Sequence, residues 1–489
     1  MWFNQILSWL LGVLVCLFPC IPIIPDSPPC TYDLYKLPAE ALEGSNSFDY
    51  WLEGADAYFE AVMGNPIEVF GSADSGSYAW NTSYAITALV KLFSFTGDSK
   101  YLDGLSSGLA MMFATLADED GDGYLNWGCT AFSPIGSYEE YCVHAGVVLT
   151  SVAEYLNLVK GDPVLAAAPS AIPGKTLGEQ ADDLIALCCD EIIASFDKDW
   201  SECYGVYMSR PGSGNFEGRT KEATLPNNQY LAMAAALYGF AKLNPGKQDV
   251  YLSRADRMIA NFKSTITFYK NGTAKWNYND KFFLFDAPKS QEDYSHAMID
   301  FQAMAAAYSR GYAVNLGNMR SIANTYETTM ARGNRLSYFV DGSGDDSGRY
   351  VYHLFDLQSF GHLAWQRGEQ FLNQVGEKNG CNAAYVLKYH PKAPTPTKPV
   401  VFLTDGASIA PDFSVLRWSV GQYASDYCLQ IAGDSSFENL LVDRPYIPHN
   451  NAIVTGLPSG QTLYVRVLAR NESGSVTVSD TVMIQTEGL

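Results

Sequence analysis

The sequence predicts a mainly α-helical protein whose helical hairpins close into an (α/α) toroid, followed by a small all-β sandwich. Apolar residues recur with helical spacing from about residue 46 to 375. Two stretches within this region repeat one pattern, in which a helix ends at a glycine-containing turn and the next helix begins with Tyr-Leu. Beyond a proline-rich stretch the apolar spacing changes to two, which is typical of strands.

Length and composition are those of a globular protein with at least one large core. The chain has 489 residues, of which 47% are hydrophobic and 17% charged. Its net charge is −21, and no basic face is evident, so we expect no nucleic-acid partner. The aromatic content of 13%, with 31 tyrosines, suits either a carbohydrate-binding groove or a helical core rich in tyrosine.

The N-terminus predicts export. Residues 5–24 form an apolar run almost without charge, so we interpret residues 1–25 as a signal peptide or a retained anchor. Residues 26–45 are a proline-rich segment. We therefore expect a secreted or cell-surface protein that contacts a membrane only if the anchor is retained.

We expect the toroid to occupy residues 46–389. Turns containing Gly97 and Gly246 each connect two helices of a hairpin, because glycine adopts the left-handed conformation that ends a helix. Paired helices of this kind suit a toroid, and an irregular all-helical domain is the alternative. The expected helices are 48–62, 79–95, 99–116, 141–159, 176–196, 227–243, 249–264, 293–312, 317–332 and 354–373.

The sequence of the C-terminal part predicts β structure. Residues 390–399 contain four prolines, which block helix formation and predict an extended linker. In the following part, 400–489, the stretches 415–420, 427–431 and 462–469 alternate as strands do.

Polar clusters occur where three of the expected helices begin, at residues 139–144, 226–230 and 292–296. If the helices are arranged in a ring, these starts line one rim and the clusters share one cleft. We therefore predict a composite site, in which residues far apart in sequence act together.

The third cluster suggests acid–base chemistry. Asp293 and His296 are neighbours one helical turn apart. A carboxylate next to an imidazole fixes its tautomer and raises its basicity, which suits a general base. We assign Asp293, Tyr294 and His296 to catalysis and Glu292 to substrate binding. The alternative is an acidic cap on the helix.

The first and second clusters supply further polar groups. His144 is a predicted catalytic residue, and a buried core histidine is the alternative. Asn228 joins it, because amides bind hydroxyl or carboxylate groups, whereas simple helix capping needs only one asparagine. The neighbouring residues predicted to bind substrate are Tyr141, Asn227, Gln229, Tyr230 and, on the preceding loop, Arg210.

Aromatic residues and an acidic loop complete the candidates. Trp276 and Tyr278 could stack on a sugar ring or form a core pair, and Trp127 is a further predicted binding residue. Oxygen ligands at first, third and fifth positions make the acidic loop resemble a calcium loop, although its twelfth residue is a cysteine. Calcium is thus a possible ion there, an acidic turn is the alternative, and no other cofactor is expected. The calcium candidates are Asp118, Asp120 and Asp122.

The part from 400 to 489 resembles a fibronectin type III domain. Trp418 lies on an early strand, and residues 457–467 read Leu-Pro-Ser-Gly-Gln-Thr-Leu-Tyr-Val-Arg-Val. In that family the tryptophan sits in the core and the tyrosine packs at the corner of the sandwich. The resemblance places Trp418 and Tyr464 at those positions and implies a spacer or binding module.

The helical part resembles the secreted α/α-toroid proteins that act on polysaccharides, which include six-hairpin glycoside hydrolases and toroid polysaccharide lyases. The motifs that carry the resemblance are the stretches 141–146, 225–230, 276–278 and 292–296. The group implies a polysaccharide substrate and two competing chemistries.

A lyase neutralises a uronate carboxylate with an amide or imidazole and removes the C5 proton with a tyrosine or histidine, as Asn228, His144, His296 and Tyr294 (or Tyr141) could do. A hydrolase uses two carboxylates, here Asp293 or Glu292 with Glu140 or Asp122. The histidine and amide content favours a lyase acting on a uronate-containing polysaccharide. A non-catalytic glycan-binding surface protein is the third alternative.

Overall fold

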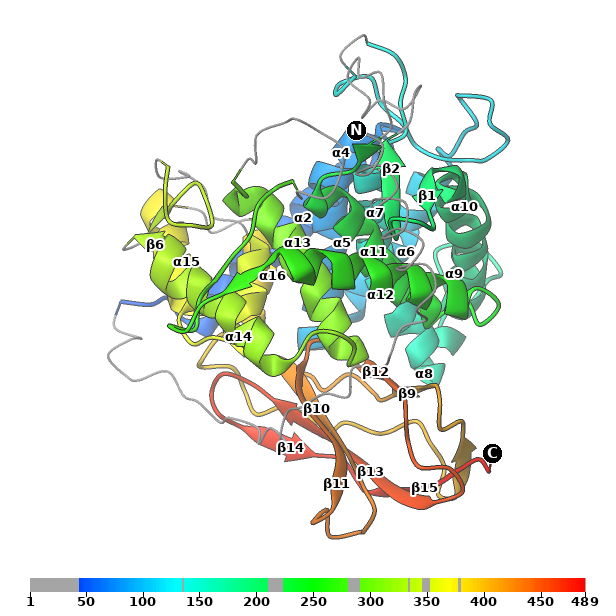
Figure 1. Cartoon of the computed structure of the whole chain (residues 1–489), viewed down its shortest axis with the longest axis vertical. Helices are drawn as coiled ribbons and strands as arrows, with labels where there is room; N and C mark the ends of the chain where they lie inside the picture. Colours follow the sequence, from blue (N-terminus) through cyan, green and yellow to red (C-terminus); the bar gives the residue numbers. More distant parts are fainter. Residues whose placement is uncertain are drawn as a thin grey trace, which may run out of the picture.

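The computed structural model describes residues 44–133, 136–209, 223–279, 291–332, 335–344, 352–376 and 380–488. The predicted signal peptide or anchor, most of the proline-rich segment and Arg210 lie outside the described residues. A helical region is followed by a C-terminal β-sheet region (Figure 1), which confirms the mainly helical class.

Long helices account for most of the first region. They are α2 (Phe48–Gly64), α5 (Ser83–Thr96), α6 (Ser99–Phe113), α7 (Cys142–Gly161), α9 (Leu177–Ala186), α11 (Asn227–Ala241), α12 (Gln248–Thr265), α13 (Tyr294–Arg310), α14 (Leu316–Asn324), α15 (Ala364–Val375) and α16 (Cys381–Lys388). Shorter helical pieces are α3 (Pro66–Phe70), α4 (Ser75–Ser77), η2 (Tyr78–Thr82), α8 (Pro163–Ala167), η3 (Leu187–Ile192), α10 (Ile193–Ser195), η4 (Asp197–Asp199), η6 (Thr325–Met330) and η7 (Tyr352–Ser359).

The helices pack in two layers. In the inner layer α5 contacts α7, α7 contacts α11, α11 contacts α13, α13 contacts η7, and α16 contacts both η7 and α5. Each inner element carries a second helix: α6 lies on α5, α9 on α7, α12 on α11, α14 on α13, α15 on η7 and α2 on α16. The buried apolar side chains of both layers form one continuous core.

The first predicted hairpin turn is confirmed. Helix α5 ends at Gly97, whose φ of 74° is in the left-handed region. Asp98 then caps α6 by accepting a hydrogen bond from the backbone N–H of Lys100. The second turn joins α11 to α12 within two residues of the predicted bounds, but α11 ends at Lys242 with no left-handed residue.

The predicted helix 354–373 is wrong, because the chain breaks into η7 and α15. The carboxylate of Glu327 accepts hydrogen bonds from the backbone N–H groups of His362 and Leu363, at 2.7 and 2.6 Å. It also fills the space beside Gly361, where a Cβ would lie 2.3 Å from a carboxylate oxygen. This contact comes from a distant segment, so local periodicity does not reveal it.

Helices α7 and α11 run parallel and in close contact. A Cβ on Gly146 would lie 2.5 Å from the backbone of Ala232 and Met233. One to two turns later Gly239 lies against Ala153, and the amide of Asn157 donates to the Gly239 carbonyl. Helix α7 is long and apolar enough to span a bilayer, but 89% of its apolar window is buried within the molecule, which is also typical of the core helix of a soluble protein.

Short strands lie at the edge of the helical region. The C-terminal region consists mainly of longer strands. The short strands are β1 (Trp200–Ser201), β2 (Val206–Ser209), β3 (Ala223–Thr224), β4 (Thr267–Phe268), β5 (Ala274–Lys275), β6 (Ala331–Arg332) and β7 (Arg335–Leu336). The C-terminal strands are β8 (Ala407–Ile409), β9 (Ser414–Arg417), β10 (Asp426–Ala432), β11 (Leu440–Ile447), β12 (Asn451–Val454), β13 (Thr462–Arg470), β14 (Val476–Val478) and β15 (Val482–Thr486).

The C-terminal strands form two sheets around a separate apolar core. One sheet has the order β11-β10-β13-β15-β8, with β14 also paired to β13, and the other pairs β12 with β9. Trp418 is fully buried between them, as the resemblance implied. Tyr464 is not at the inward position, because Leu463, Val465 and Val467 face the core and alternation turns Tyr464 outward.

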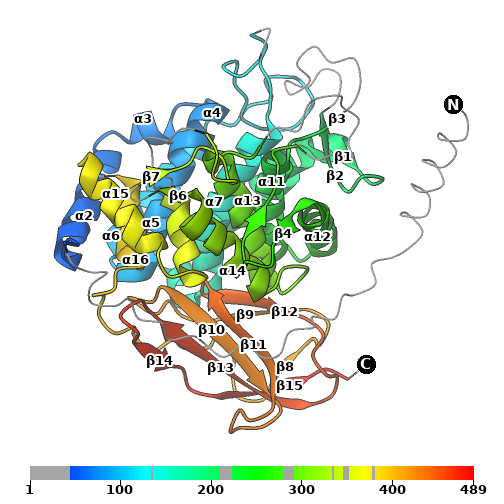
Figure 2. The same ribbon diagram turned by 60° about the vertical axis from the view of Figure 1, so that its left-hand side comes forward.

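The β-sheet region lies against one end of the helices, with β9 and β12 nearest to them (Figures 1 and 2). Hydrogen bonds cross the boundary: Tyr423 donates its backbone N–H to Phe95 O, and the Tyr308 hydroxyl donates to Pro445 O. Arg470 is buried and contacts Asp426 and Glu472, which in turn accept from Ser359 and Gln358 of η7.

Candidate functional site

The three polar clusters lie at one end of the helices. The C-terminal halves of α5, α7, α11 and α13 all line one cavity beside the β-sheet region, so these helices run in the same direction. Their starts therefore lie at the opposite end, where the segment before α7 (cyan) rises above the helices (Figures 1 and 2). The backbone N–H of Asn227 donates to Tyr278 O, and the Tyr278 ring lies 5.0 Å from that of His296. This segment joins the starts of α11 and α13.

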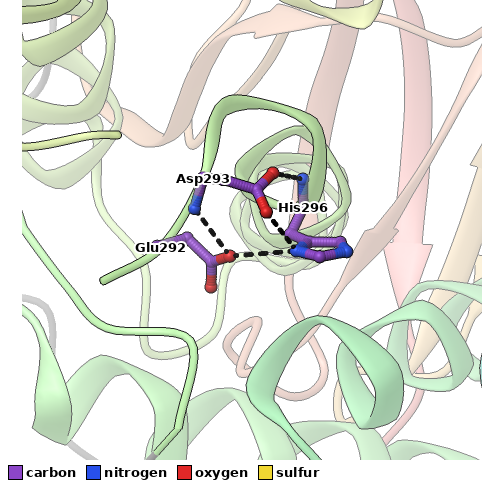
Figure 3. A group of neighbouring side chains, drawn as sticks. All are labelled: Glu292, Asp293 and His296. Atoms are coloured by element: carbon purple, nitrogen blue, oxygen red, sulfur yellow. Dashed lines mark hydrogen bonds and ion pairs between the residues drawn. The ribbon is translucent and has the colours of Figure 1, made fainter. Parts of the chain in front are cut away.

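Asp293 and His296 form a pair at the first turn of α13 (Figure 3). Asp293 Oδ1 accepts from the backbone N–H groups of Ser295 and His296, and Asp293 Oδ2 lies 2.8 Å from His296 Nδ1. Burial opposes ionisation of Asp293, but the hydrogen bond and charge of His296 and the Ser295 hydroxyl outweigh it and lower its pKa to about 2. The Asp293 carboxylate therefore both caps α13, as the alternative interpretation expected, and contacts the imidazole of His296. The His296 side chain remains 36% exposed.

Two further carboxyl groups lie behind this pair. Glu292 and Asp300 are buried, and Asp300 Oδ2 accepts from Trp276 Nε1 at 2.8 Å. Burial raises the pKa of both acids, to about 7 for Asp300, and the charge of Asp300 adds to the rise at Glu292, whose pKa lies well above its usual range. Glu292 Oε2 and Asp300 Oδ1 are buried and have no hydrogen-bond partner elsewhere among the described residues, so burial favours the protonated form of both acids.

These contacts correct two sequence interpretations. The Trp276 ring is buried edge-on against Phe262 and orients Asp300, so it is not a platform for a sugar. Glu292 is fully buried and so cannot touch substrate. Asp300 was missed by the sequence analysis, although a lone acid within the apolar face of an expected helix was a signal for it.

The third cluster also offers a set of metal ligands. Glu292, Asp293 and His296 each provide one ligand atom, and these atoms lie within 4.8 Å of one another. Figure 3 shows the three side chains pointing toward one another at the start of α13. Carboxylate and imidazole groups suit a divalent transition metal, so these residues could hold one in place of the hydrogen bond to Asp293.

His144 is buried in an aromatic surround. Its Nδ1 lies 2.9 Å from Ser75 Oγ, and the rings of Trp80, Phe132 and Tyr141 lie 5.5, 5.1 and 4.9 Å away. Burial lowers the pKa of His144 to about 4, against the smaller opposing charge of Asp74. The imidazole is therefore neutral at pH 7 and cannot neutralise a carboxylate as a cation.

The residues at the start of α11 divide into two kinds. Asn227 donates its side-chain amide to Asn277 O at 2.8 Å and accepts from the Tyr230 hydroxyl at 2.8 Å, so both are buried and hold the Tyr278 segment. Asn228 Oδ1 and Gln229 Oε1 are buried and have no hydrogen-bond partner among the described residues. Both oxygens are hydrogen-bond acceptors that lie below the surface at the start of α11.

Other predicted binding residues belong to the core or its edge. Trp127 is buried between Tyr78 and Phe113, and its Nε1 donates to Thr115 Oγ1, so it is not a sugar-binding residue. Tyr141 is also buried, where its ring contacts His144. Tyr294 is half-buried with its ring 5.8 Å from that of Tyr338.

The acidic loop before α7 lies close to Glu140. Carboxylate oxygens of Asp118, Asp120 and Asp122 lie within 4.8 Å of one another, and Lys198 pairs with Asp122. Burial and then the charges of Asp120 and Asp122 raise the pKa of Glu140 to about 7, although Asn126 donates to it at 2.9 Å. The three aspartates could hold calcium, and Lys198 would compete with the ion.

Comparisons with known proteins identify no family for this chain. No family model matches it, and no curated protein matches it. A Fn3-like protein from Clostridium thermocellum is 21% identical over 20% of this chain and 98% of that chain, with a TM-score of 0.16. The C-terminal β-sheet region fits a fibronectin type III domain in its strand pairing.

Proposed function

We propose that the helical region is an (α/α) toroid and that the protein is a secreted lyase of uronate-containing polysaccharides. Support for the toroid comes from the inner helices, whose contacts run from α5 through α7, α11, α13, η7 and α16 back to α5. Helices α6, α9, α12, α14, α15 and α2 lie on them in the same order. The N-terminal ends of the inner helices then form one rim that carries the polar clusters.

The observation that carries the proposed activity is the contact of 2.8 Å between Asp293 Oδ2 and His296 Nδ1. A carboxylate 2.8 Å from Nδ1 leaves Nε2 of a part-exposed imidazole as the base. Nε2 removes the C5 proton of the uronate, and Asp293 stabilises the imidazolium that results. The electron pair of the broken C5–H bond forms the C4–C5 double bond as the bond from C4 to the glycosidic oxygen breaks. The leaving oxygen takes a proton from Tyr294.

The proton at C5 becomes acidic only if the uronate carboxylate is neutralised or hydrogen-bonded. His144 is neutral, so this role falls to uncharged donors, and the side-chain N–H groups of Asn228 and Gln229 at the start of α11 would supply them. The protonation that burial favours in Glu292 and Asp300 lowers the negative charge behind the base, which helps an anionic substrate to approach.

A glycoside hydrolase is the second candidate, and Glu140 favours it. A carboxyl with a pKa of about 7 is a suitable general acid at neutral pH, and the ionised Asp293 would be its counterpart. Glu292 drops out of this mechanism because it is fully buried.

Incubation with a panel of uronate-containing and neutral polysaccharides separates the candidates. A lyase releases reducing ends together with an unsaturated product that absorbs ultraviolet light. Reducing ends without that absorbance identify a hydrolase. Binding of polysaccharide without either signal identifies the protein as a non-catalytic glycan-binding protein.

A further inference from the structure

A cavity lined by both polar and apolar side chains lies at the far end of the helices from the predicted site. It has a volume of about 130 Å³ and lies between the C-terminal halves of α5, α7, α11 and α13 and the loop that leads into β12. That volume exceeds several-fold the space that one water molecule needs. The β-sheet region covers this end of the helices in both views (Figures 1 and 2).

The walls of the cavity are fixed by contacts between the two regions. Arg417 donates to Lys242 O at 2.8 Å, and Arg444 donates to Ser309 O at 2.9 Å. The Tyr308 hydroxyl donates to Pro445 O at 2.8 Å. The cavity is therefore preformed, which lowers the entropic cost of binding a ligand.

Among the described residues that line this cavity, Lys91, Lys242, Arg310 and Lys388 outnumber the carboxyls Glu154 and Asp356, although the chain as a whole carries a net charge of −21. Arg310 also lies 3.8 Å from Asp256 behind it. Lys91 and Lys388 share Asp356, at 3.4 and 3.9 Å, whereas Lys242 donates to the uncharged amide of Asn451 at 2.6 Å. Burial lowers the pKa of Lys242 to about 7, and the nearby Arg417 adds to the effect. The charge of Glu154 opposes both influences in part, and a bound anion next to Lys242 would oppose them further.

Polar atoms without a protein partner also belong to the cavity-lining residues. Among the described residues, Asn157 Oδ1, Ser309 Oγ and Arg310 Nε are buried and make no hydrogen bond. Arg310 and Ser309 are donors suited to a carboxylate, and Asn157 Oδ1 is an acceptor suited to a hydroxyl. Buried polar groups are normally paired, so this set indicates a partner that carries both kinds of group.

We propose that this cavity binds a small hydroxylated carboxylate, the size of a single sugar acid, between Lys242, Arg310 and Asn157. The carboxylate contacts Lys242 and Arg310, and a hydroxyl donates to Asn157 Oδ1. This site is separate from the predicted catalytic residues and does not depend on the proposed lyase activity. Binding ties the helices to the β-sheet region, because residues of both regions surround the ligand.

Calorimetric titration of the full chain with glucuronate tests the site, with glucose as the uncharged comparison. We expect saturable binding of glucuronate, weaker binding of glucose, and a loss of at least about tenfold in affinity for Lys242→Met, because the bond to a charged group is removed. Lys160→Met is the matched control, since Lys160 pairs with Asp182 at the surface, and it leaves affinity unchanged.

Ser309→Ala is the second variant, in case Lys242→Met does not fold. It removes a hydroxyl without a partner among the described residues and weakens glucuronate binding. It is preferred to Asn157→Asp as the variant that preserves the fold, because aspartate would also lose the hydrogen bonds that Asn157 donates to Ala153 O and Gly239 O. His296→Ala leaves binding intact. The proposal is overturned if glucuronate does not bind, if glucose binds equally well, if both cavity variants bind as the wild type does, or if His296→Ala abolishes binding. Failure of the polysaccharide assay bears only on the proposed lyase.

Discussion

The two ends of the inner helices differ in charge and in exposure. At the N-terminal end, acidic groups collect: Asp293 caps α13, and the pair of Glu292 and Asp300 lies behind it. At the C-terminal end, cations collect: Lys242 caps α11, while Arg310 and Lys388 occupy the last turns of α13 and α16. One end presents a part-exposed histidine, and the other is covered by the β-sheet region.

The helix dipole explains this distribution. The N-terminal end of a helix carries partial positive charge and stabilises anions, whereas the C-terminal end stabilises cations. Helices that run in the same direction add these preferences at each end: α13 has Asp293 at its start and Arg310 in its last turn, and α11 ends at Lys242. The overall charge of the chain does not show this separation, and the proposed functions of the two ends follow from it.

The largest expected effect is at the covered end. Arg470→Met leaves Asp426 and Glu472 buried without their cation and lowers the free energy of unfolding by about 3–5 kcal/mol. Denaturant unfolding followed by circular dichroism measures it. Arg466→Met is the control on the same strand, because Arg466 is part-buried beside Gln430 and Phe437. Equal stabilities for the two variants would show that the buried ion pairs do not hold the covered end together.

The next effect concerns pH and the acidic end. The folded pKa of Asp300 is raised to about 7, so the unfolded chain loses this proton first as pH rises, and stability falls between about pH 4 and pH 7. Asp300→Asn removes the part of this slope that Asp300 contributes, on the order of 4 kcal/mol between pH 4 and pH 7, whereas Glu292, whose pKa burial also raises, keeps its own part. Urea titrations at several pH values measure it.

The control for this experiment is Asp249→Asn on the exposed start of α12. We expect the free energy of unfolding of Asp249→Asn to depend on pH as that of the wild type does. If the pH dependence of stability is the same in Asp300→Asn as in the wild type, then Asp300 does not have a raised pKa in the folded protein.

A smaller effect tests the close contact of α7 and α11. This contact holds the two helices parallel, so that their N-terminal ends lie together and their C-terminal ends lie together. Gly146→Ala forces a Cβ against the backbone of Ala232 and lowers stability by about 1–3 kcal/mol. Gly64→Ala is its match, since nothing lies within 4 Å of a Cβ there, and it is neutral or stabilising. Thermal unfolding measures both, and a tolerated Gly146→Ala would refute the close contact.

The smallest effect concerns the acidic loop. If Asp118, Asp120 and Asp122 hold calcium, the ion stabilises the fold by about 1.4 kcal/mol at ten times its Kd. Thermal shift with calcium, and with magnesium for comparison, measures this, and Asp120→Asn removes the response. An unchanged melting temperature in calcium would identify the loop as an acidic turn.

Periodicity predicted most long helices and the three C-terminal strands β9, β10 and β13, because each of these elements buries one face and the spacing of its apolar residues records that face. The break between η7 and α15 was not predicted, since Glu327 causes it from a distant segment. Helix α16 was also missed, because its eight residues are too few to show a period.

The sequence predicted polar clusters at the helix starts, and the structure places these starts at one end of the helices; the shared cleft stays a prediction. Residues 292–296 and 226–230 were recognised because polar residues at a helix start stand out against an apolar run. The roles of Trp127, Trp276 and Glu292 were assigned wrongly, because side-chain burial depends on packing against distant segments. Asp300 and the cavity at Lys242 depend on the same packing, so the sequence alone did not reveal them.

The measurement that tests the central claim most directly is the ultraviolet assay of uronate polysaccharides with the wild type, His296→Ala and Asp293→Asn. We expect unsaturated product from the wild type, a loss of about 10²–10⁴-fold in kcat/KM for His296→Ala, and a smaller loss for Asp293→Asn with unchanged folding. Full activity of His296→Ala, or product without ultraviolet absorbance from the wild type, would contradict the claim that His296 is the base of a lyase.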